Sequence, residues 1–319
     1  MNHTTARIKA GTPTTDRITC PLCHSNNLLQ REYLPAVSVN LLYKKHFGIE
    51  NAFNSTGFRY MNCPRCFLDF FDPLEAGCED LYEHLQTFPW YYMTEKWEHK
   101  YARQFIRQAD RVLEVGAGLA AFGKFIGLER YTGLEFNDRA IQRAKDEGIS
   151  LLKESAVSHA ACAPEYDIVV TFQVLEHVPN PDDFISGCLR CLKPGGLLII
   201  GVPAKDGFAG AAVNHALDMP PHHLTHWSKA SLEKVATLFS LDLVNLAYEP
   251  VASYHRNWAN HIAISNRLRR LFGLRHCLLD DTIVAKILSH TASMLARVLP
   301  GTFLHGLGHT VVAVYRIPK

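Results

Sequence analysis

A glycine-rich turn at the end of a short apolar stretch constrains the fold more than any other feature. Residues 111–123 read RVLEVGAGLAAFG, so the stretch from Gly116 to Ala121 satisfies the dinucleotide fingerprint G-x-G-x-x-G/A. Glu135 follows Gly116 by nineteen positions, where a ribose-binding acid is expected. Glycines allow positive φ and close backbone approach, and the following helix points N–H groups at a ligand. The turn therefore predicts a strand, a nucleotide-type site and a helix.

The alternation of apolar strands with helical segments extends this prediction to a whole domain. Helical spacing is evident in DRAIQRAKDEG and PDDFISGCLRCL, which fall between apolar segments. Such alternation predicts a mainly parallel, doubly wound α/β sheet. The segments expected to form its strands read RVLEVG, YTGLEF, YDIVVTF, LLIIGVP, LDLVNLAYEP and GHTVVAVYRI. Helices are also expected over 91–109, leading into the domain, and over 255–299.

Composition narrows the setting of the chain. The 319 residues are 47% hydrophobic and 20% charged, with a formal net charge of +2, an ordinary globular balance. No apolar run approaches the roughly 18 residues of a membrane helix, and residues 1–17 read as a flexible polar leader without the apolar core of a signal peptide. Nine cysteines, an odd number and partly in C-x-x-C pairs, favour a reducing compartment. We expect a cytoplasmic protein with no membrane partner.

Two C-x-x-C pairs in the N-terminal region indicate a metal site. Cys20 and Cys23 form one pair, Cys63 and Cys66 the other, with thirty-nine residues between Cys23 and Cys63. Four thiolates on two tight turns suit a closed tetrahedral zinc site of the structural kind. A redox role is the alternative for either pair, but the first lacks a βαβ context and two pairs are present. The sequence predicts structural Zn²⁺ and a zinc-binding module over residues 18–90.

The second half of the α/β region carries the resemblance to a known family. YDIVVTFQVLEHVPNPDDF followed by LKPGGLLIIGVP resembles class I S-adenosylmethionine (SAM)-dependent methyltransferases, in which an LEHV-type helix start and a PGG turn precede the fifth strand. The resemblance implies a Rossmann-like sheet of seven strands, the last antiparallel, over residues 91–319, with a helical insertion at about 252–300. The acid two residues before Gly116, Glu114, suits the ammonium of SAM, whereas a carboxylate would gain nothing beside a pyrophosphate. SAM is therefore expected in place of NAD.

The resemblance also places the cofactor on individual residues. It implies that the methionine part of SAM binds at the glycine turn, that the ribose hydroxyls bind Glu135, and that the adenine lies beside Phe136 and close to Glu154 or Ser155. The end of the fourth strand would line the cofactor floor, where a loop residue satisfying backbone groups is the alternative for Gln173. The predicted cofactor-binding residues are Glu114, Gly116, Ala117, Gly118, Glu135, Phe136, Glu154, Ser155, Gln173 and Val174.

A histidine-rich segment after the fifth strand is the candidate for the acceptor site. It reads NHALDMPPHHLTHWS and includes His222 and His223. FRYMNCPRCFLDFFDP resembles the zinc module of some bacterial class I methyltransferases, which include deoxysugar C-methyltransferases. In those enzymes a Tyr-His-x-His-Leu-x-Tyr segment supplies the base, and its second His falls on His223, although its first Tyr falls on Pro220. His223, His222 and His177 are the predicted catalytic residues; a structural role for each, or a metal bound by this segment, is the alternative.

These observations favour an enzyme that methylates a small molecule. The expected reaction is O- or C-methylation of a sugar, a sugar nucleotide or a natural-product intermediate. An RNA methyltransferase that grips its substrate with the zinc module is the second hypothesis, although acids and bases are mixed in that module, so a nucleic-acid partner is not expected. A non-catalytic SAM-binding scaffold is the third. The acceptor, the methylated atom and the oligomeric state are left open by the sequence.

Overall fold

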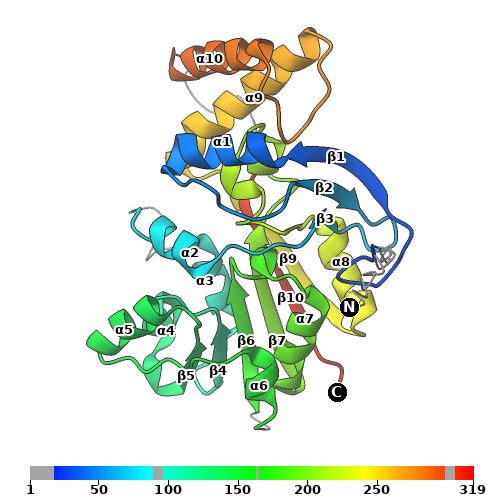
Figure 1. Ribbon diagram of the computed structural model, residues 1–319. Helices are drawn as coiled ribbons and strands as arrows, with labels where there is room; N and C mark the ends of the chain where they lie inside the picture. The colour runs from blue at the N-terminus through cyan, green and yellow to red at the C-terminus, as the bar shows by residue number, and fades with distance from the viewer. Residues whose placement is uncertain (1–17, 89–95, 163–164, 299–305) are drawn as a thin grey trace, which may run out of the picture.

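A six-stranded sheet and a smaller four-stranded sheet organise the molecule (Figure 1). The structure is a computed structural model, and it describes residues 18–88, 96–162, 165–298 and 306–319. The predicted leader over residues 1–17 lies outside the described residues. In Figure 1 the six-stranded sheet occupies the lower half, whereas the smaller sheet lies above it together with the helices α1, α9 and α10.

The large sheet has the strand order β5-β4-β6-β7-β10-β9. The strands β5, β4, β6 and β7 run parallel, whereas β10 is antiparallel to both β7 and β9. This confirms the α/β fold class and the antiparallel last strand. The strands are β4 (Val112–Val115), β5 (Tyr131–Leu134), β6 (Tyr166–Phe172), β7 (Leu192–Pro203), β9 (Asp242–Pro250) and β10 (Leu307–Arg316).

The expected seventh strand is not formed in the described part of the chain. At the edge beside β5, only an isolated parallel bridge joins Leu134 to Leu152. The chain cannot extend this pairing, because Ser155 already caps the next helix through a hydrogen bond from the backbone N–H of Ser158. Among the described residues the sheet therefore has six strands, one fewer than the seven predicted.

Helices cover both faces of the large sheet. Alternate residues of β7 point to opposite sides: Ile199 packs with Phe122 of α4, whereas Ile200 packs with Ile185 of α7. Period-2 alternation of apolar side chains thus gives two hydrophobic faces, as a buried sheet requires. The helices of this layer are α3 (Trp97–Ala102), α4 (Ala121–Ile126), α5 (Asp138–Asp146), α6 (Ala156–Ala160), α7 (Pro181–Arg190) and α8 (Lys229–Leu238).

The helix expected over 91–109 is shorter than predicted. Within the described residues it consists of α3 and a 3-10 turn, Arg103–Phe105. The chain turns extended at Ile106, whose carbonyl oxygen accepts a hydrogen bond from the guanidinium of Arg103. Ile106 is buried beside the sheet, so its packing ends the helix one turn early.

The smaller sheet joins the cysteine-rich region to the large domain. Its strand order is β1-β2-β3-β8, and its last strand, β8 (Thr225–His226), belongs to the histidine-rich segment. The remaining elements of this region are β1 (Leu29–Pro35), α1 (Ala36–Phe47), β2 (Gly57–Asn62), β3 (Asp69–Asp72) and α2 (Glu79–Leu85).

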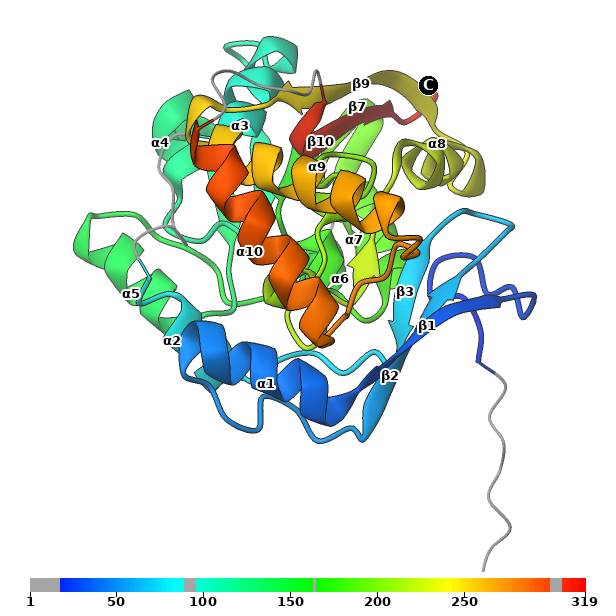
Figure 2. The same cartoon turned by 90° about the horizontal axis from the view of Figure 1, so that it is seen from above.

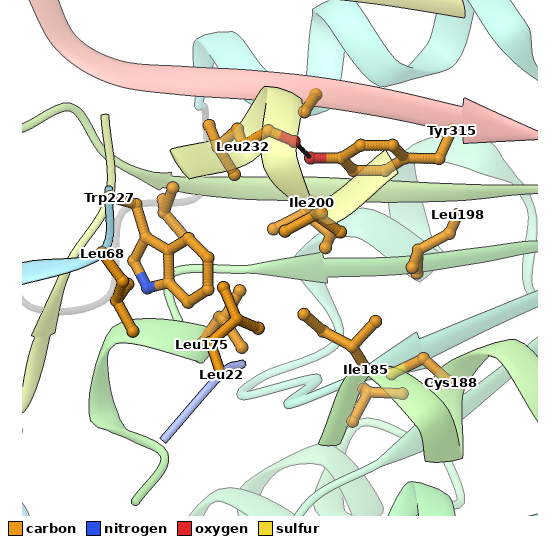
Figure 3. Packing of buried hydrophobic residues seen from close by; sticks show 14 of the residues in the cluster. Leu22, Leu68, Leu175, Ile185, Cys188, Leu198, Ile200, Trp227, Leu232 and Tyr315 are labelled. Carbon is orange, nitrogen blue, oxygen red and sulfur yellow. Dashed lines mark hydrogen bonds between the residues drawn. The ribbon is translucent and has the colours of Figure 1, made fainter. Parts of the chain in front are cut away.

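One hydrophobic core runs beneath both sheets. Figure 3 shows the fully buried indole of Trp227 between Leu68, from the cysteine-rich region, and the neighbouring Leu175. The same cluster continues to Ile200 and to Tyr315, whose hydroxyl donates a hydrogen bond to the carbonyl of Leu232 at 2.8 Å. The cysteine-rich region therefore does not bury its apolar surface alone, but against the large domain.

Two long helices, α9 (Arg256–Leu271) and α10 (Ile283–Val298), follow β9 and confirm the expected helices over 255–299. Figure 2 shows them stacked side by side above the sheets, with α1 nearby. Their connection is tied to the histidine-rich segment, because Asn214 exchanges hydrogen bonds with the backbone of Asp280. No helix among the described residues is long and apolar enough to cross a membrane.

Candidate functional site

The principal cleft opens at the point where the order of the parallel strands reverses. The chain leaves β4 to form β5 on one side and then returns to form β6 on the other. Ligands of open α/β sheets bind outside the carboxyl ends of strands at such a position. The cleft measures about 1540 Å³. Because a single small-molecule pocket occupies roughly 300–1,000 Å³, this cleft has room for a cofactor and a second molecule.

The glycine turn forms the floor of the cleft at the end of β4. Gly116 has φ +81°, and a Cβ atom there would lie 2.3 Å from Cγ2 of Val174, at the end of β6. Gly118 and Ala120 also have positive φ, at 53° and 54°. Only glycine therefore allows the two strand ends to meet, and the exposed backbone is free to approach a ligand closely.

Glu135 organises the loop after β5. One carboxylate oxygen accepts a hydrogen bond from the N–H of Gly118 at 2.7 Å, and the other accepts from the N–H groups of Phe136 and Asn137 at 2.8 and 2.9 Å. The carboxylate is thus held in place and lines the cleft. Phe136 lines the cleft next to Glu135, and its side chain is 61% exposed. A planar ligand can therefore cover its ring.

Glu114 is a buried acid next to the glycine turn. It is 3% exposed and accepts a hydrogen bond from the hydroxyl of Tyr131. Burial raises its pKa to about 8, although the hydrogen bond from Tyr131 opposes the rise. A cationic ligand group would favour the ionised form. The ammonium of an amino acid moiety fits this environment, so the residues at the turn suit SAM.

The other predicted cofactor residues also line the cleft, and three of them contact other protein groups. Glu154 lies 3.1 Å from Nδ1 of His159, and the hydroxyl of Ser155 already caps α6. Gln173 has φ +56°, and its amide nitrogen lies 3.4 Å from oxygens of both Glu98 and Thr310. Ala117 and Val174 complete the set, and all ten predicted residues line this one cleft. Their binding roles remain predictions.

The histidine-rich segment forms the opposite wall. Nδ1 of His223 lies 3.0 Å from Oδ1 of Asp218. Burial alone would raise the pKa of Asp218, but contacts with His226 and His223 hold it well below its ordinary value. An ionised carboxylate only accepts hydrogen bonds, so Nδ1 of His223 donates and Nε2 carries the free lone pair. Burial lowers the pKa of His223, whereas Asp218 acts to raise it. The effect of burial is the larger one, so it keeps the ring neutral.

The other two histidines predicted to be catalytic pack against this ring. Nδ1 of His177 donates to the carbonyl of His222, and Nδ1 of His222 donates to the carbonyl of Leu217 at 2.9 Å. Their ring centroids lie 4.5 Å apart, and those of His222 and His223 lie 4.7 Å apart. Burial lowers the pKa of His177 to about 3. The rings of His177 and His222 both line the cleft. Each donates a hydrogen bond to a backbone carbonyl, which is a structural role, whereas His223 contacts the side chain of Asp218.

The cysteine-rich region supports the histidine-rich segment through hydrogen bonds. The N–H of Phe71, in β3, donates to the carbonyl of Leu224, and the hydroxyl of Tyr60, in β2, lies 2.9 Å from Nδ1 of His226. The hydroxyl of Tyr43 donates to the carbonyl of Met219 at 3.1 Å. The backbone of the histidine segment is therefore positioned by residues that precede the glycine turn by forty or more positions in the sequence.

The four predicted zinc ligands come together at the far end of this region. Sγ of Cys20 lies 3.5 Å from Sγ of Cys66, Cys23 lies equally far from Cys63, and all four sulfur atoms are buried within 4.8 Å of one another. Zinc–sulfur bonds of about 2.3 Å in a tetrahedron place sulfur atoms about 3.8 Å apart. The donor set and spacing fit zinc, and no disulfide joins them.

Sequence reasoning missed three buried acids on the cleft wall. Glu98, Glu176 and Glu249 are 4%, 2% and 7% exposed, and all three line the cleft. Glu98 falls on a helix whose apolar face includes Trp97 and Tyr101, and Glu176 falls inside the LEHV motif. An acid embedded in an apolar pattern is the signal that could have found them.

The middle part of the chain is similar to known proteins. A family described as a methyltransferase domain matches residues 90–246. A protein from Klebsiella pneumoniae (strain 342), named ubiquinone biosynthesis O-methyltransferase, is 29% identical over 160 residues, which are 46% of this chain. The match spans 66% of that relative's own length. A protein of the same name from Dechloromonas aromatica (strain RCB) is 30% identical over 161 residues, 44% of this chain and 69% of the relative.

Solved structures with a related fold are more distant in sequence. A SAM-dependent methyltransferase from Archaeoglobus fulgidus aligns over 75% of this chain and 95% of its own, with 16% identity and a TM-score of 0.44.

Proposed function

Because the chain belongs to the class I SAM-dependent methyltransferases, we propose that it transfers a methyl group from SAM to a small-molecule acceptor. The acceptor is a sugar, a sugar nucleotide or a natural-product intermediate, and the methylated atom is an oxygen or a carbon. One observation carries the proposal: His223, held by Asp218, lines the same cleft as the glycine turn at Gly116.

The residues at the end of β4 and β5 hold the cofactor in this proposal. The backbone at Gly116 and Gly118 cradles the amino acid part, Glu114 meets its ammonium, and Glu135 accepts hydrogen bonds from ribose hydroxyls. SAM supplies, when bound, a methyl group on a sulfonium sulfur that is open to in-line attack. The chain contributes position and a site shielded from water, which together supply much of the rate in such reactions.

His223 is the base that accepts the proton of the acceptor. Its Nε2 has the free lone pair, and Asp218 orients the ring and stabilises the imidazolium that forms. Burial lowers the pKa of His223, so the ring is in the neutral form that a base requires at physiological pH. A base is needed only when the acceptor carries a proton of high pKa, as hydroxyl groups and activated carbons do.

The cysteine-rich region, over residues 18–90, is assigned a structural role. Cys20, Cys23, Cys63 and Cys66 bind Zn²⁺ in this proposal, which keeps the strands β2 and β3 in place behind the histidine segment. Tyr60, in β2, is hydrogen-bonded to His226, and Phe71, in β3, is hydrogen-bonded to Leu224. These two contacts connect the zinc-bound region to the histidine segment. The zinc is distant from the chemistry and takes no step in it.

The proposal is tested with purified protein and methyl-labelled SAM. The protein is offered, in parallel, a small-metabolite extract and total RNA, with His223→Ala as the control variant. Label is expected in the small-molecule fraction with the native protein and is expected to be lost with the variant. Label in RNA would contradict the small-molecule acceptor, and label that persists in His223→Ala would contradict the assigned base.

A further inference from the structure

The cleft carries more acidic side chains than basic ones. Among the described residues that line it are seven carboxylates, against two lysines, and these residues include no arginine. One of the lysines, Lys153, pairs with Asp138 outside the cleft. Glu114 and Glu135 serve the cofactor in the proposed function, and Glu154 is predicted to lie close to the adenine, but Glu98, Glu176 and Glu249 have no such task. A molecule that brought phosphate groups past them would meet like charges.

Glu176 is the most unusual of these acids. Its side chain is 2% exposed, and neither carboxylate oxygen has a hydrogen-bond partner. Nε2 of His177 lies 3.7 Å from it, but burial lowers the pKa of His177 to about 3, so this ring is neutral and offers no counter-charge. Buried carboxylates are normally paired or hydrogen-bonded. A partner that enters the cleft from solution would satisfy Glu176.

Two further buried acids lie within electrostatic range of the same position. Burial raises the pKa values of both Glu176 and Glu249. The charge of Glu98 adds to both rises, whereas the charge of Lys96, which also lines the cleft, lowers the pKa of Glu176. The amide nitrogen of Gln173 lies 3.4 Å from a carboxylate oxygen of Glu98. The three acids come from α3, β9 and the turn after β6, so they line one cleft although they are far apart in the sequence.

Aromatic rings line the cleft beside these acids. Tyr254 lines the same cleft as Glu98 and Glu249. The indole of Trp258 also lines the cleft, and it packs against His309, the neighbour of Thr310. The faces of such rings attract cations, and the attraction is strongest where water is excluded.

We propose that the acceptor carries a protonated amine, and that this ammonium group binds at Glu176, in the part of the cleft that Glu98 and Glu249 also line. This inference rests on the proposed function, since it names the chemical class of the second molecule in the cleft. An ammonium offers three donors, and both carboxylate oxygens of Glu176 lack a hydrogen-bond partner. An amino sugar or another amine-bearing intermediate fits the site, whereas a sugar nucleotide, with its pyrophosphate, does not. The amine anchors the acceptor, and the atom beside His223 is the one methylated.

Binding is tested without any transfer step. The protein is saturated with S-adenosylhomocysteine at pH 7, and three small probes of similar size are titrated by ligand-observed NMR: 2-aminoethanol, ethylene glycol and glycolate. The cation is expected to bind about tenfold more tightly than the neutral probe, and the anion most weakly. Equal affinities, or a preference for glycolate, would overturn the proposal.

Variants assign the preference to the cluster. Glu176→Gln and Glu98→Gln keep the side-chain size and are each expected to abolish the preference for 2-aminoethanol. Asp183→Asn, which removes an exposed carboxylate of the same cleft, is expected to retain it. If the preference survives in both glutamine variants, the proposal is wrong. It is equally wrong if Mg²⁺ or Zn²⁺ binds at Glu176 while 2-aminoethanol does not, because the cluster is then a metal site.

Transfer then distinguishes this inference from the proposed function. The metabolite extract is separated on cation- and anion-exchange resins before labelling. Label is expected in the fraction that the cation exchanger retains, and label in the anion-exchange fraction would contradict the amine. Absence of label from every fraction, with binding of 2-aminoethanol intact, would count against the methyltransferase activity and not against the amine site.

Discussion

Nδ1 of His223 lies 3.0 Å from Oδ1 of Asp218, inside a wall that the residues of the cysteine-rich region support. The contact fixes which ring nitrogen carries the proton and leaves Nε2 as the acceptor. His226 shares the same carboxylate, at 3.3 Å. Asp218 therefore acts through His223 as a positioning residue, and its removal has consequences that differ from a loss of folding.

Asp218→Asn is expected to lower kcat by roughly 100-fold or more, because the asparagine no longer imposes the tautomer or stabilises the imidazolium. Affinity for S-adenosylhomocysteine is expected to be unchanged. The pH profile gives the specific readout. Since Asp218 raises the pKa of His223, its loss lowers that pKa, and the acidic limb of kcat/KM moves to lower pH. An unmoved limb would show that Asp218 is merely structural.

Cofactor binding is expected to release protons through Glu114. The pKa of this acid is about 8 in the free protein, and a cationic ligand lowers it by favouring the ionised form. Affinity for SAM therefore decreases as pH falls below about 8, by up to about tenfold per pH unit. Calorimetry in two buffers of different ionisation enthalpy measures the released protons. Glu114→Gln is expected to bind more weakly and to lose this component, and identical proton release in the variant would contradict the assignment.

Gly116→Ala is expected to abolish cofactor binding, because the added Cβ meets Val174 at 2.3 Å and the backbone has φ +81°. Gly148→Ala is the matched control, with φ +77° and no atom within 4 Å of its Cβ. The control separates backbone strain, which both variants share and which costs about 1 kcal/mol, from the close approach at Gly116. If both variants bind S-adenosylhomocysteine equally well, the close approach has no role.

Purified protein is expected to contain one zinc ion per chain, measured by inductively coupled plasma mass spectrometry. Cys66→Ser is expected to lose the metal and to unfold at a temperature lower by roughly 10 °C or more, since structural zinc contributes several kcal/mol to folding. Cys162→Ser, at an exposed cysteine, is the control and is expected to keep both. A zinc-free protein of unchanged stability would leave the four cysteines as buried thiols.

The extent of sequence-based prediction differs between elements for physical reasons. Local patterns sufficed where the interaction is local: the glycines at Gly116 and Gly118 predicted the turn, and the alternation of apolar strands with helical segments predicted the sheet. The seventh strand was wrong because Ser155 caps a helix where pairing beyond Leu152 would continue. Such competition between a cap and a strand edge is decided by the surrounding packing and not by propensity.

The sequence by itself determined the fold class, the family and the four-cysteine cluster, because each depends on residue types at fixed short spacings. Only the tertiary structure decided what faces the second half of the cleft. Glu98, Glu176 and Glu249 lie 73 or more positions apart in the sequence, so no spacing rule connects them. Their placement along one cleft follows from the strand order and from the packing of α3 against the sheet. The charge of the acceptor site is therefore a property of the fold, not of a motif.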